Sequence, residues 1–234
     1  QSRVKQLEKV DRIEVEDELD SVSFSFPTPE RSGQIVMKLD QIIKKYGDNT
    51  VFEGVDFEIE RGDKVAVVGP NGAGKSTLIR ILAGSEPIQG GERKEGHKVT
   101  TSYFAQHQAE ELDLNADPLE IMMQAGSGEK ESRLRSILGS FLFTGDDVFK
   151  KVKVLSGGEK SRLALAKMLL SPANFLIFDE PTNHLDMSSK NILQQALQQY
   201  EGTCMIVSHD RSFLDPIVNK VLEIQPGKLR TYLG

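Results

Sequence analysis

The residues best suited to chemistry stand in a glycine-rich loop in the first third of the chain. The segment from residue 69 to residue 77 reads Gly-Pro-Asn-Gly-Ala-Gly-Lys-Ser-Thr, which matches the pattern of a phosphate-binding loop. An apolar strand is predicted before it at 64–68, and a helical pattern follows at 77–82. Backbone N–H groups and the helix N-terminus can then surround phosphate oxygens. A purely structural turn is the alternative, and the flanking strand and helix argue against it. The predicted phosphate contacts are Gly69, Pro70, Asn71, Gly72, Ala73, Gly74, Lys75, Ser76 and Thr77.

Two adjacent carboxylates, Asp179 and Glu180, end the apolar run at 175–178. A Ser76 hydroxyl and an Asp179 carboxylate are oxygen ligands of the kind that Mg²⁺ takes beside a nucleotide. Glu180 could orient or deprotonate an attacking water. A simple helix cap is the alternative for this acidic pair. With the phosphate-binding loop upstream, hydrolysis of a magnesium nucleotide is the stronger interpretation.

A third motif, Leu155-Ser156-Gly157-Gly158-Glu159, precedes a helix predicted at 159–170. Ser156 and the N–H groups of Gly157 and Gly158 are therefore candidates for a second phosphate-binding helix terminus. With this motif the chain resembles the ABC ATPases, whose signature sequence it matches. In that family the signature faces the γ-phosphate of ATP held by another cassette. The resemblance thus implies that a second ATP-binding cassette completes the site.

The same resemblance assigns roles to residues outside these motifs. It implies that Gln106 is the Q-loop residue, with a catalytic and metal-binding role, and that His209 contacts the γ-phosphate. Asp186 would lie at the dimer interface. Tyr46 stands where the family places an aromatic ring that stacks on adenine, and a core tyrosine is the alternative.

The segment 183–186, Asn-His-Leu-Asp, is similar to the ABC-F branch, whose members hold two cassettes and no membrane domain. Residues 1–33, a charged helical pattern at 1–19 followed by a Pro- and Gly-containing turn, resemble the end of the ABC-F interdomain linker. This implies a C-terminal cassette at 34–234 with a helical insertion at about 107–155. It also implies action on the ribosome or tRNA, although the charged segment at 1–19 carries only four basic residues, too few for a strong RNA footprint.

Two other interpretations stay open at this point. The chain could be the ATPase subunit of a membrane transporter, which would need a groove for a membrane protein. It could also be a nucleotide-gated binding module in which slow hydrolysis acts as a timer.

The elements that must position these residues indicate an α/β fold. Continuous apolar runs at 65–68, 175–178 and 205–207, separated by helical stretches, predict parallel strands buried on both faces. Alternation at 55–60 predicts a half-buried strand in an antiparallel layer. The resemblance implies the ABC type of P-loop fold, in which a mixed sheet is joined by that antiparallel layer and a small helical subdomain.

Composition agrees with a globular cytoplasmic protein. Hydrophobic residues make up 38% and charged residues 27% of the 234, and the net charge is −6. No window approaches the roughly 20 apolar residues of a spanning helix, and the N-terminus does not resemble a cleavable signal. The single Cys204 excludes a disulfide within the chain and is predicted in a buried strand. The start at Gln1 instead of Met leads us to expect part of a longer protein.

Overall fold

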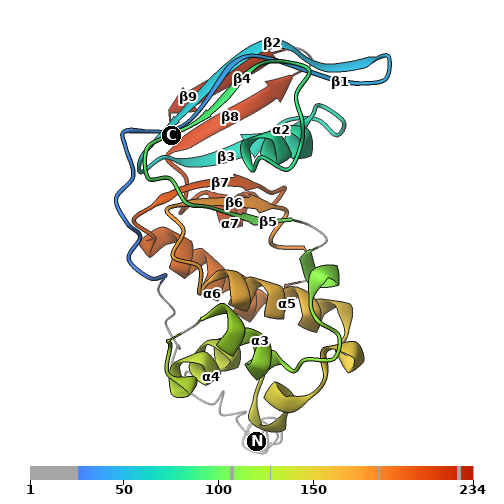
Figure 1. Cartoon of the computed structure of the whole chain (residues 1–234), viewed down its shortest axis with the longest axis vertical. Helices are drawn as coiled ribbons and strands as arrows, with labels where there is room; N and C mark the ends of the chain where they lie inside the picture. Colours follow the sequence, from blue (N-terminus) through green and yellow to red (C-terminus); the bar gives the residue numbers. More distant parts are fainter. Residues whose placement is uncertain (1–25, 106–107, 127, 184, 226–227, 234) are drawn as a thin grey trace, which may run out of the picture.

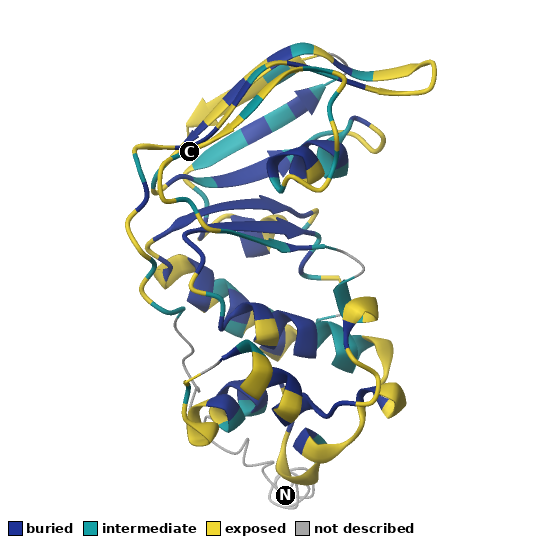
Figure 2. Ribbon diagram, in the orientation of Figure 1, coloured by how far each residue is buried: buried dark blue, intermediate teal, exposed yellow. Residues whose placement is uncertain are grey.

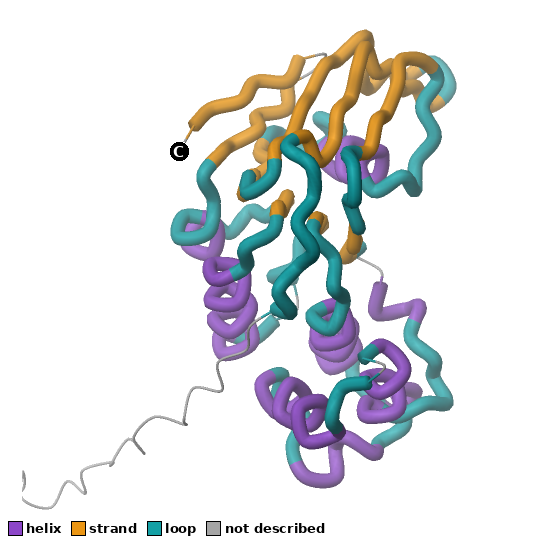
Figure 3. Tube along the Cα trace, turned by 60° about the vertical axis from the view of Figure 1, so that its left-hand side comes forward, coloured by secondary structure: helices purple, strands orange, loops and turns teal. Residues whose placement is uncertain are grey.

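The computed structural model describes residues 26–105, 108–126, 128–183, 185–225 and 228–233. The helix predicted at 1–19, as well as Gln106, lies outside the described residues. The described part is elongated, with two sheets at one end and helices at the other (Figure 1; Figure 3, turned by 60°). Within these ranges, no helix combines the length and the apolar character needed to cross a membrane.

An antiparallel sheet forms the outer layer at the sheet end (Figure 1). Its strand order is β2-β1-β4, with β1 at Ile35–Tyr46, β2 at Asn49–Glu60 and β4 at Gly90–Glu95. The alternation predicted at 55–60 is confirmed, because Val55, Phe57 and Ile59 are buried while the acidic residues between them are exposed. A half-buried strand with one apolar face has this pattern.

The central sheet has six strands in the order β5-β6-β7-β3-β8-β9. The strands are β3 (Lys64–Val68), β5 (Thr101–Phe104), β6 (Phe175–Asp179), β7 (Thr203–Val207), β8 (Lys220–Gln225) and β9 (Lys228–Leu233). All neighbours are parallel except β8 and β9, so the sheet is mixed. Strands β6 and β7 are buried along their whole length, as their continuous apolar runs predict (Figure 2).

Two hydrophobic clusters cover the two faces of this sheet. Helix α2 (Lys75–Leu82) packs between the central sheet and the antiparallel layer, in one cluster with Val65, Val67 and Ile177. Alternate strand residues such as Ala66 and Phe178 face the other cluster. That second cluster includes side chains from α5 (Gly157–Met168), α6 (Met187–Gln199) and α7 (Arg211–Leu214). Helix α2, which begins in the phosphate-binding loop, therefore packs against both the central sheet and the antiparallel layer.

The segment from 108 to 154 is helical and lies at the end of the molecule away from the sheets (Figure 1). It contains η1 (Gln108–Glu111), α3 (Pro118–Ala125), α4 (Glu131–Ser140), η2 (Gly145–Phe149) and η3 (Val152–Val154). A capping box between Asp117 and Glu120 starts α3, with Pro118 in the first turn. The domain boundaries at 34 and at about 107–155 stay predictions.

Candidate active site

The glycine-rich loop connects β3 to α2, and two of its glycines are required by close approach. Gly74 has a φ of 102°, and a Cβ there would lie 2.6 Å from Cγ1 of Val51 on β2. Gly69 has a φ of 150°, and a Cβ there would collide with the carbonyl oxygen of Ile224 on β8. Larger residues would push the loop away from both sheets, so the sequence has glycine at these positions.

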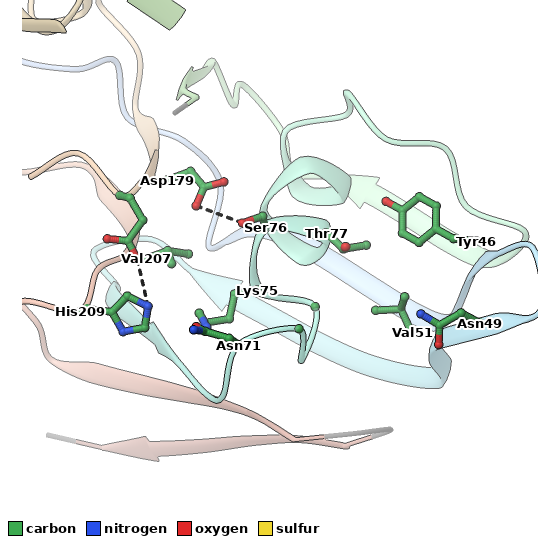
Figure 4. A pocket seen from close by; sticks show the side chains of 13 residues that line it. Tyr46, Asn49, Val51, Asn71, Lys75, Ser76, Thr77, Asp179, Val207 and His209 are labelled. Atoms are coloured by element: carbon green, nitrogen blue, oxygen red, sulfur yellow. Dashed lines mark hydrogen bonds and ion pairs between the residues drawn. The ribbon is translucent and has the colours of Figure 1, made fainter. Parts of the chain in front are cut away.

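A pocket of about 460 Å³ opens over this loop (Figure 4). Of the predicted site residues, it brings together Tyr46, Asn71, Gly72, Gly74, Lys75, Ser76, Thr77, Asp179, Glu180 and His209. Gly69, Pro70 and Ala73 belong to the loop but do not line the pocket. The pocket is also lined by Asn49, Val51 and Val207, which were not predicted as site residues. The only signal for Asn49 was its place in a turn-forming Gly-Asp-Asn stretch directly after Tyr46.

The Lys75 side chain folds back over its own loop. Its ammonium donates to the carbonyl oxygens of Gly69 at 2.9 Å and Pro70 at 3.1 Å. The cation is thus held beside the N-terminus of α2, whose first backbone N–H groups carry the positive end of the helix dipole. Both groups favour an anion in the pocket.

Ser76 and Asp179 meet beside the loop. The Ser76 hydroxyl donates to Oδ1 of Asp179 at 3.3 Å, and Asp179 is buried at the end of β6 (Figure 4). A hydroxyl and a carboxylate are hard oxygen donors, and Mg²⁺ usually takes one or two such protein ligands together with substrate phosphates. The donor set therefore fits a magnesium ion bound with a nucleotide.

Glu180 follows Asp179 in an uncommon backbone conformation, with a φ of 51°. Its N–H donates to the carbonyl oxygen of Val207 at 2.9 Å, which ties the end of β6 to the end of β7. Burial raises the pKa of the Glu180 carboxyl above its ordinary value, and the neighbouring Asp179 adds to this, although His209 and Lys75 oppose it. A carboxylate with a raised pKa is a stronger base.

The loop that carries His209 is held by a chain of polar contacts that were not predicted from the sequence. The Ser208 hydroxyl lies 3.2 Å from that of Thr182 and accepts from the N–H of Asp210 at 3.1 Å. The Asp210 carboxylate accepts from the Lys190 ammonium at 2.6 Å. Hydrogen bonds from Lys190 and Ser212 lower the pKa of Asp210 to about 2. These contacts connect the His209 loop to α6.

The signature residues lie away from this pocket, since Ser156, Gly157 and Gly158 are not among its lining residues. Helix α5 begins at Gly157, two residues before the predicted start, because Ser156 is its N-cap. The Ser156 hydroxyl accepts from the N–H of Glu159 at 3.3 Å, and a Glu159 carboxylate oxygen lies 2.7 Å from the N–H of Ser156. This reciprocal capping box leaves the helix terminus exposed at the surface.

Asp186 has a similar structural role at the start of α6. One carboxylate oxygen accepts from the N–H of Ser189 at 2.9 Å, and the other lies 3.4 Å from Arg162 of α5. The carboxylate therefore caps α6 and connects it to α5. Asp186 is also absent from the pocket lining. Its role at a dimer interface stays a prediction.

Similarity to known proteins agrees with these features. A family model described as ABC transporter matches residues 52–183, more than half of the chain. Two Arabidopsis thaliana proteins, ABC transporter F family members 5 and 2, are each 39% identical to it over 235 residues. The alignments cover all of this chain but only 34% and 35% of those proteins. The chain thus spans about a third of the length of these curated relatives.

Solved structures share the fold. An ATP-bound bacterial Atm1-family ABC exporter gives a TM-score of 0.73 at 20% identity, covering 89% of this chain and 41% of that chain. A dimeric post-hydrolysis state of the cassette MJ0796, bound to ADP and Pi, gives 0.70 at 20% identity, covering 84% and 98%. The predicted fold, a mixed sheet with an antiparallel layer, is confirmed. Together with the family match, this shows that the chain belongs to the ABC transporter family as an ATP-binding domain, with relatives in the F branch.

Proposed function

We propose that this chain binds Mg-ATP in the pocket over residues 69–77 and hydrolyses it when a second cassette completes the site. The observation that carries the proposal is the meeting of three groups in one pocket. They are the Lys75 ammonium on its loop, the Ser76–Asp179 oxygen pair, and the Glu180 carboxylate beside His209. The ammonium would compensate phosphate charge, the oxygen pair would hold Mg²⁺, and the carboxylate would activate the attacking water.

The triphosphate would lie along the loop, where Lys75 and the N-terminus of α2 compensate its charge. Tyr46 lies at the other end of the pocket from Lys75, with 42% of its surface exposed (Figure 4). Its ring is available to stack on adenine. Such stacking contributes about 1–3 kcal/mol and tolerates a change of base.

In the chemical step, Glu180 accepts a proton from a water molecule as the water oxygen forms a bond to the γ-phosphorus. The bond from that phosphorus to the bridging oxygen of ADP breaks, so the products are ADP and phosphate. His209, whose Nε2 lies 3.5 Å from Glu180 Oε1, would contact the γ-phosphate. When bound, Mg²⁺ would neutralise charge on the phosphate oxygens, with Ser76 and Asp179 as its protein ligands and Gln106 as a further predicted one.

A second cassette is part of the proposal because Ser156, Gly157 and Gly158 do not line the pocket of their own chain. The N-terminus of α5, which is exposed at Ser156 and Gly157, suits the γ-phosphate of a nucleotide bound by a partner. The dimeric state of the MJ0796 cassette supports such pairing. The partner would be the first cassette of a longer protein or a second copy of this chain.

We further propose that the cellular target is the ribosome or its bound tRNA, as the resemblance to the ABC-F branch implies. Sedimentation of the Glu180→Gln chain with purified ribosomes in ATP tests this. Ribosome binding that requires ATP is expected. Co-purification with a membrane protein in place of ribosomes would favour a transporter subunit, and normal cellular function of the hydrolysis-dead variant would favour a nucleotide-gated binding module.

The binding part of the proposal is tested with Lys75→Ala. Removing this ammonium leaves the triphosphate charge partly uncompensated, so ATP affinity should fall at least about 10-fold. Lys38→Ala removes one positive charge from an exposed position on β1 and is the matched control. Isothermal calorimetry in Mg²⁺ measures both. Equal affinities in the two variants would contradict the assignment.

A further inference from the structure

A buried lysine contacts Tyr46, which lines the pocket. Lys44, on β1, has 2% of its surface exposed, and its ammonium lies 2.6 Å from Oε1 of Glu86 and donates to the carbonyl oxygen of Pro87 at 2.8 Å. The other Glu86 carboxylate oxygen lies 3.8 Å from Arg80 of α2. Lys44 is fully buried and Glu86 is partly buried, with 16% of its side chain exposed. Taking a charge out of water costs several kcal/mol before the attraction of its partner offsets it. Stability alone is therefore a weak explanation for this pair, since apolar residues of similar volume often serve as well.

The pair holds the side chain of Tyr46. The Lys44 ammonium lies over the Tyr46 ring, 4.4 Å from its centroid, which is within cation–π range. Lys44 holds the pKa of the Glu86 carboxyl below its ordinary value although burial opposes this, and the Tyr46 hydroxyl acts on that pKa in the same direction as Lys44. The Lys44 ammonium of the ion pair thus contacts one face of the ring.

The Tyr46 ring contacts the ion pair and also lines the pocket. Tyr46 lines the pocket, whereas Lys44 and Glu86 do not. The ion pair therefore reaches the pocket through the Tyr46 ring. If the Tyr46 side chain lacked these contacts, a stacking base would have to immobilise it. That ordering would cost about 0.5–1.5 kcal/mol of binding free energy.

The ion pair also connects the two ends of the pocket. Glu86 follows α2, and its N–H donates to the carbonyl oxygen of Arg80 in that helix at 3.2 Å. The same helix begins at the phosphate-binding loop. Through Glu86, the ring that would meet the base is attached to the helix that would hold the phosphates, which keeps the two subsites at one separation.

We propose that the Lys44–Glu86 ion pair positions the nucleotide base by holding the Tyr46 ring in the orientation that stacks on the purine. The inference rests on the proposed binding of ATP in this pocket. Lys44 and Glu86 are positioning residues, because neither lines the pocket and both act through Tyr46. They should affect recognition of the base and leave recognition of the phosphates unchanged.

The test compares ATP with inorganic tripolyphosphate, which lacks the base, by calorimetry in Mg²⁺. Lys44→Met removes the charge and keeps most of the buried volume. We expect ATP to bind about 3- to 10-fold more weakly, in line with the cost of ordering one side chain, while tripolyphosphate affinity stays unchanged. Lys45→Met, the same change at the exposed neighbour, should alter neither affinity. An equal loss for both ligands in Lys44→Met would overturn the inference.

A double-mutant cycle with Tyr46→Ala separates positioning from a general structural effect. If Lys44 acts through the ring, Lys44→Met should weaken ATP binding no further once Tyr46 is alanine. Additive losses would overturn the inference. If Tyr46→Ala itself leaves the ratio of ATP to tripolyphosphate affinity unchanged, adenine stacking is wrong. If Tyr46→Ala weakens ATP binding but Lys44→Met binds ATP normally, adenine stacking stands and only the positioning role of Lys44 is overturned.

Lys44→Met leaves the Glu86 carboxylate without its main partner, which could unfold this region. The variant Lys44→Met/Glu86→Leu removes both charges and keeps an apolar filling. We expect this double variant to lose ATP affinity and to keep its tripolyphosphate affinity. A cooperative thermal melt would show that it is still folded. Normal ATP affinity in this folded variant would overturn the proposal.

Discussion

Nε2 of His209 lies 3.5 Å from Oε1 of Glu180, although 28 residues separate them in the chain. Each residue follows a strand, and Asp179 of β6 is paired with Val207 of β7 in a parallel register. Parallel strands end at the same edge of a sheet, and open α/β sheets bind their ligands outside that edge. The register of two central strands is therefore what brings the proposed base to the proposed γ-phosphate contact.

Glu180→Gln should separate nucleotide binding from hydrolysis. The amide keeps the shape of the side chain but cannot accept the water proton, so turnover should fall about 10²- to 10⁴-fold. ATP affinity should be retained, because a negative charge near the phosphates is removed. Phosphate release and equilibrium binding measure the two effects. Glu58→Gln, an exposed change on β2, is the control, and near-normal turnover in Glu180→Gln would contradict its role as the base.

The same variant should be more stable than the unmodified chain in nucleotide-free buffer at neutral pH. Burial raises the pKa of Glu180 in the folded state, so keeping the carboxylate ionised costs stability at every pH above that raised pKa. Glutamine has no such cost. The difference in melting temperature should shrink as the pH falls through the raised pKa and vanish below the ordinary glutamate value. A difference that is unchanged between neutral pH and pH 4 would contradict this.

Gly74→Ala should damage both the loop and nucleotide binding. The φ of 102° strains an alanine, and its Cβ would press against Val51, so a loss of about 1–3 kcal/mol in unfolding free energy is expected. Gly139→Ala is the matched control, because Gly139 lies in α4 with open space around its Cβ position. There a gain of up to about 1 kcal/mol is expected. Denaturant titration and ATP binding compare the two; equal stability would refute the steric argument.

A complementation experiment tests whether the site is shared between chains. Lys75→Ala disables the loop and leaves the signature intact, whereas Ser156→Arg does the reverse, so each variant alone should be inactive. In a mixture, heterodimers pair the loop of the Ser156→Arg chain with the signature of the Lys75→Ala chain. One complete site out of two should form, and part of the ATPase activity should return.

The concentration dependence of this experiment is its control. The ATPase activity per molecule of the unmodified chain should rise with chain concentration as dimers form. Mixing should restore activity in the same concentration range. Continued inactivity of the mixture, at concentrations where the unmodified chain is dimeric and active, would show that the signature of one chain does not serve the loop of another.

The sequence by itself determined the parts of this protein whose geometry is local. The loop at 69–77 lies between a strand and a helix that were predicted from their patterns, and β3 covers the predicted 64–68. The apolar runs that became β6 and β7 could be identified because strands buried on both faces are apolar throughout. Asp179 and Glu180 could be assigned because they directly follow one of these runs.

Only the tertiary structure decided the features that depend on residues far apart in the chain. Lys44 looks like a solvated charge in the Lys44-Lys45 pair, yet it is buried and contacts Glu86 and Pro87 from the segment after α2. Val51 and Asn49 reach the pocket because β2 passes beside the loop, which also explains why Gly74 has no room for a Cβ. The hydrophobic periodicity of the sequence indicates which face of a helix or strand is apolar. It does not report which element covers that face, because the contact depends on the register and packing of the whole chain.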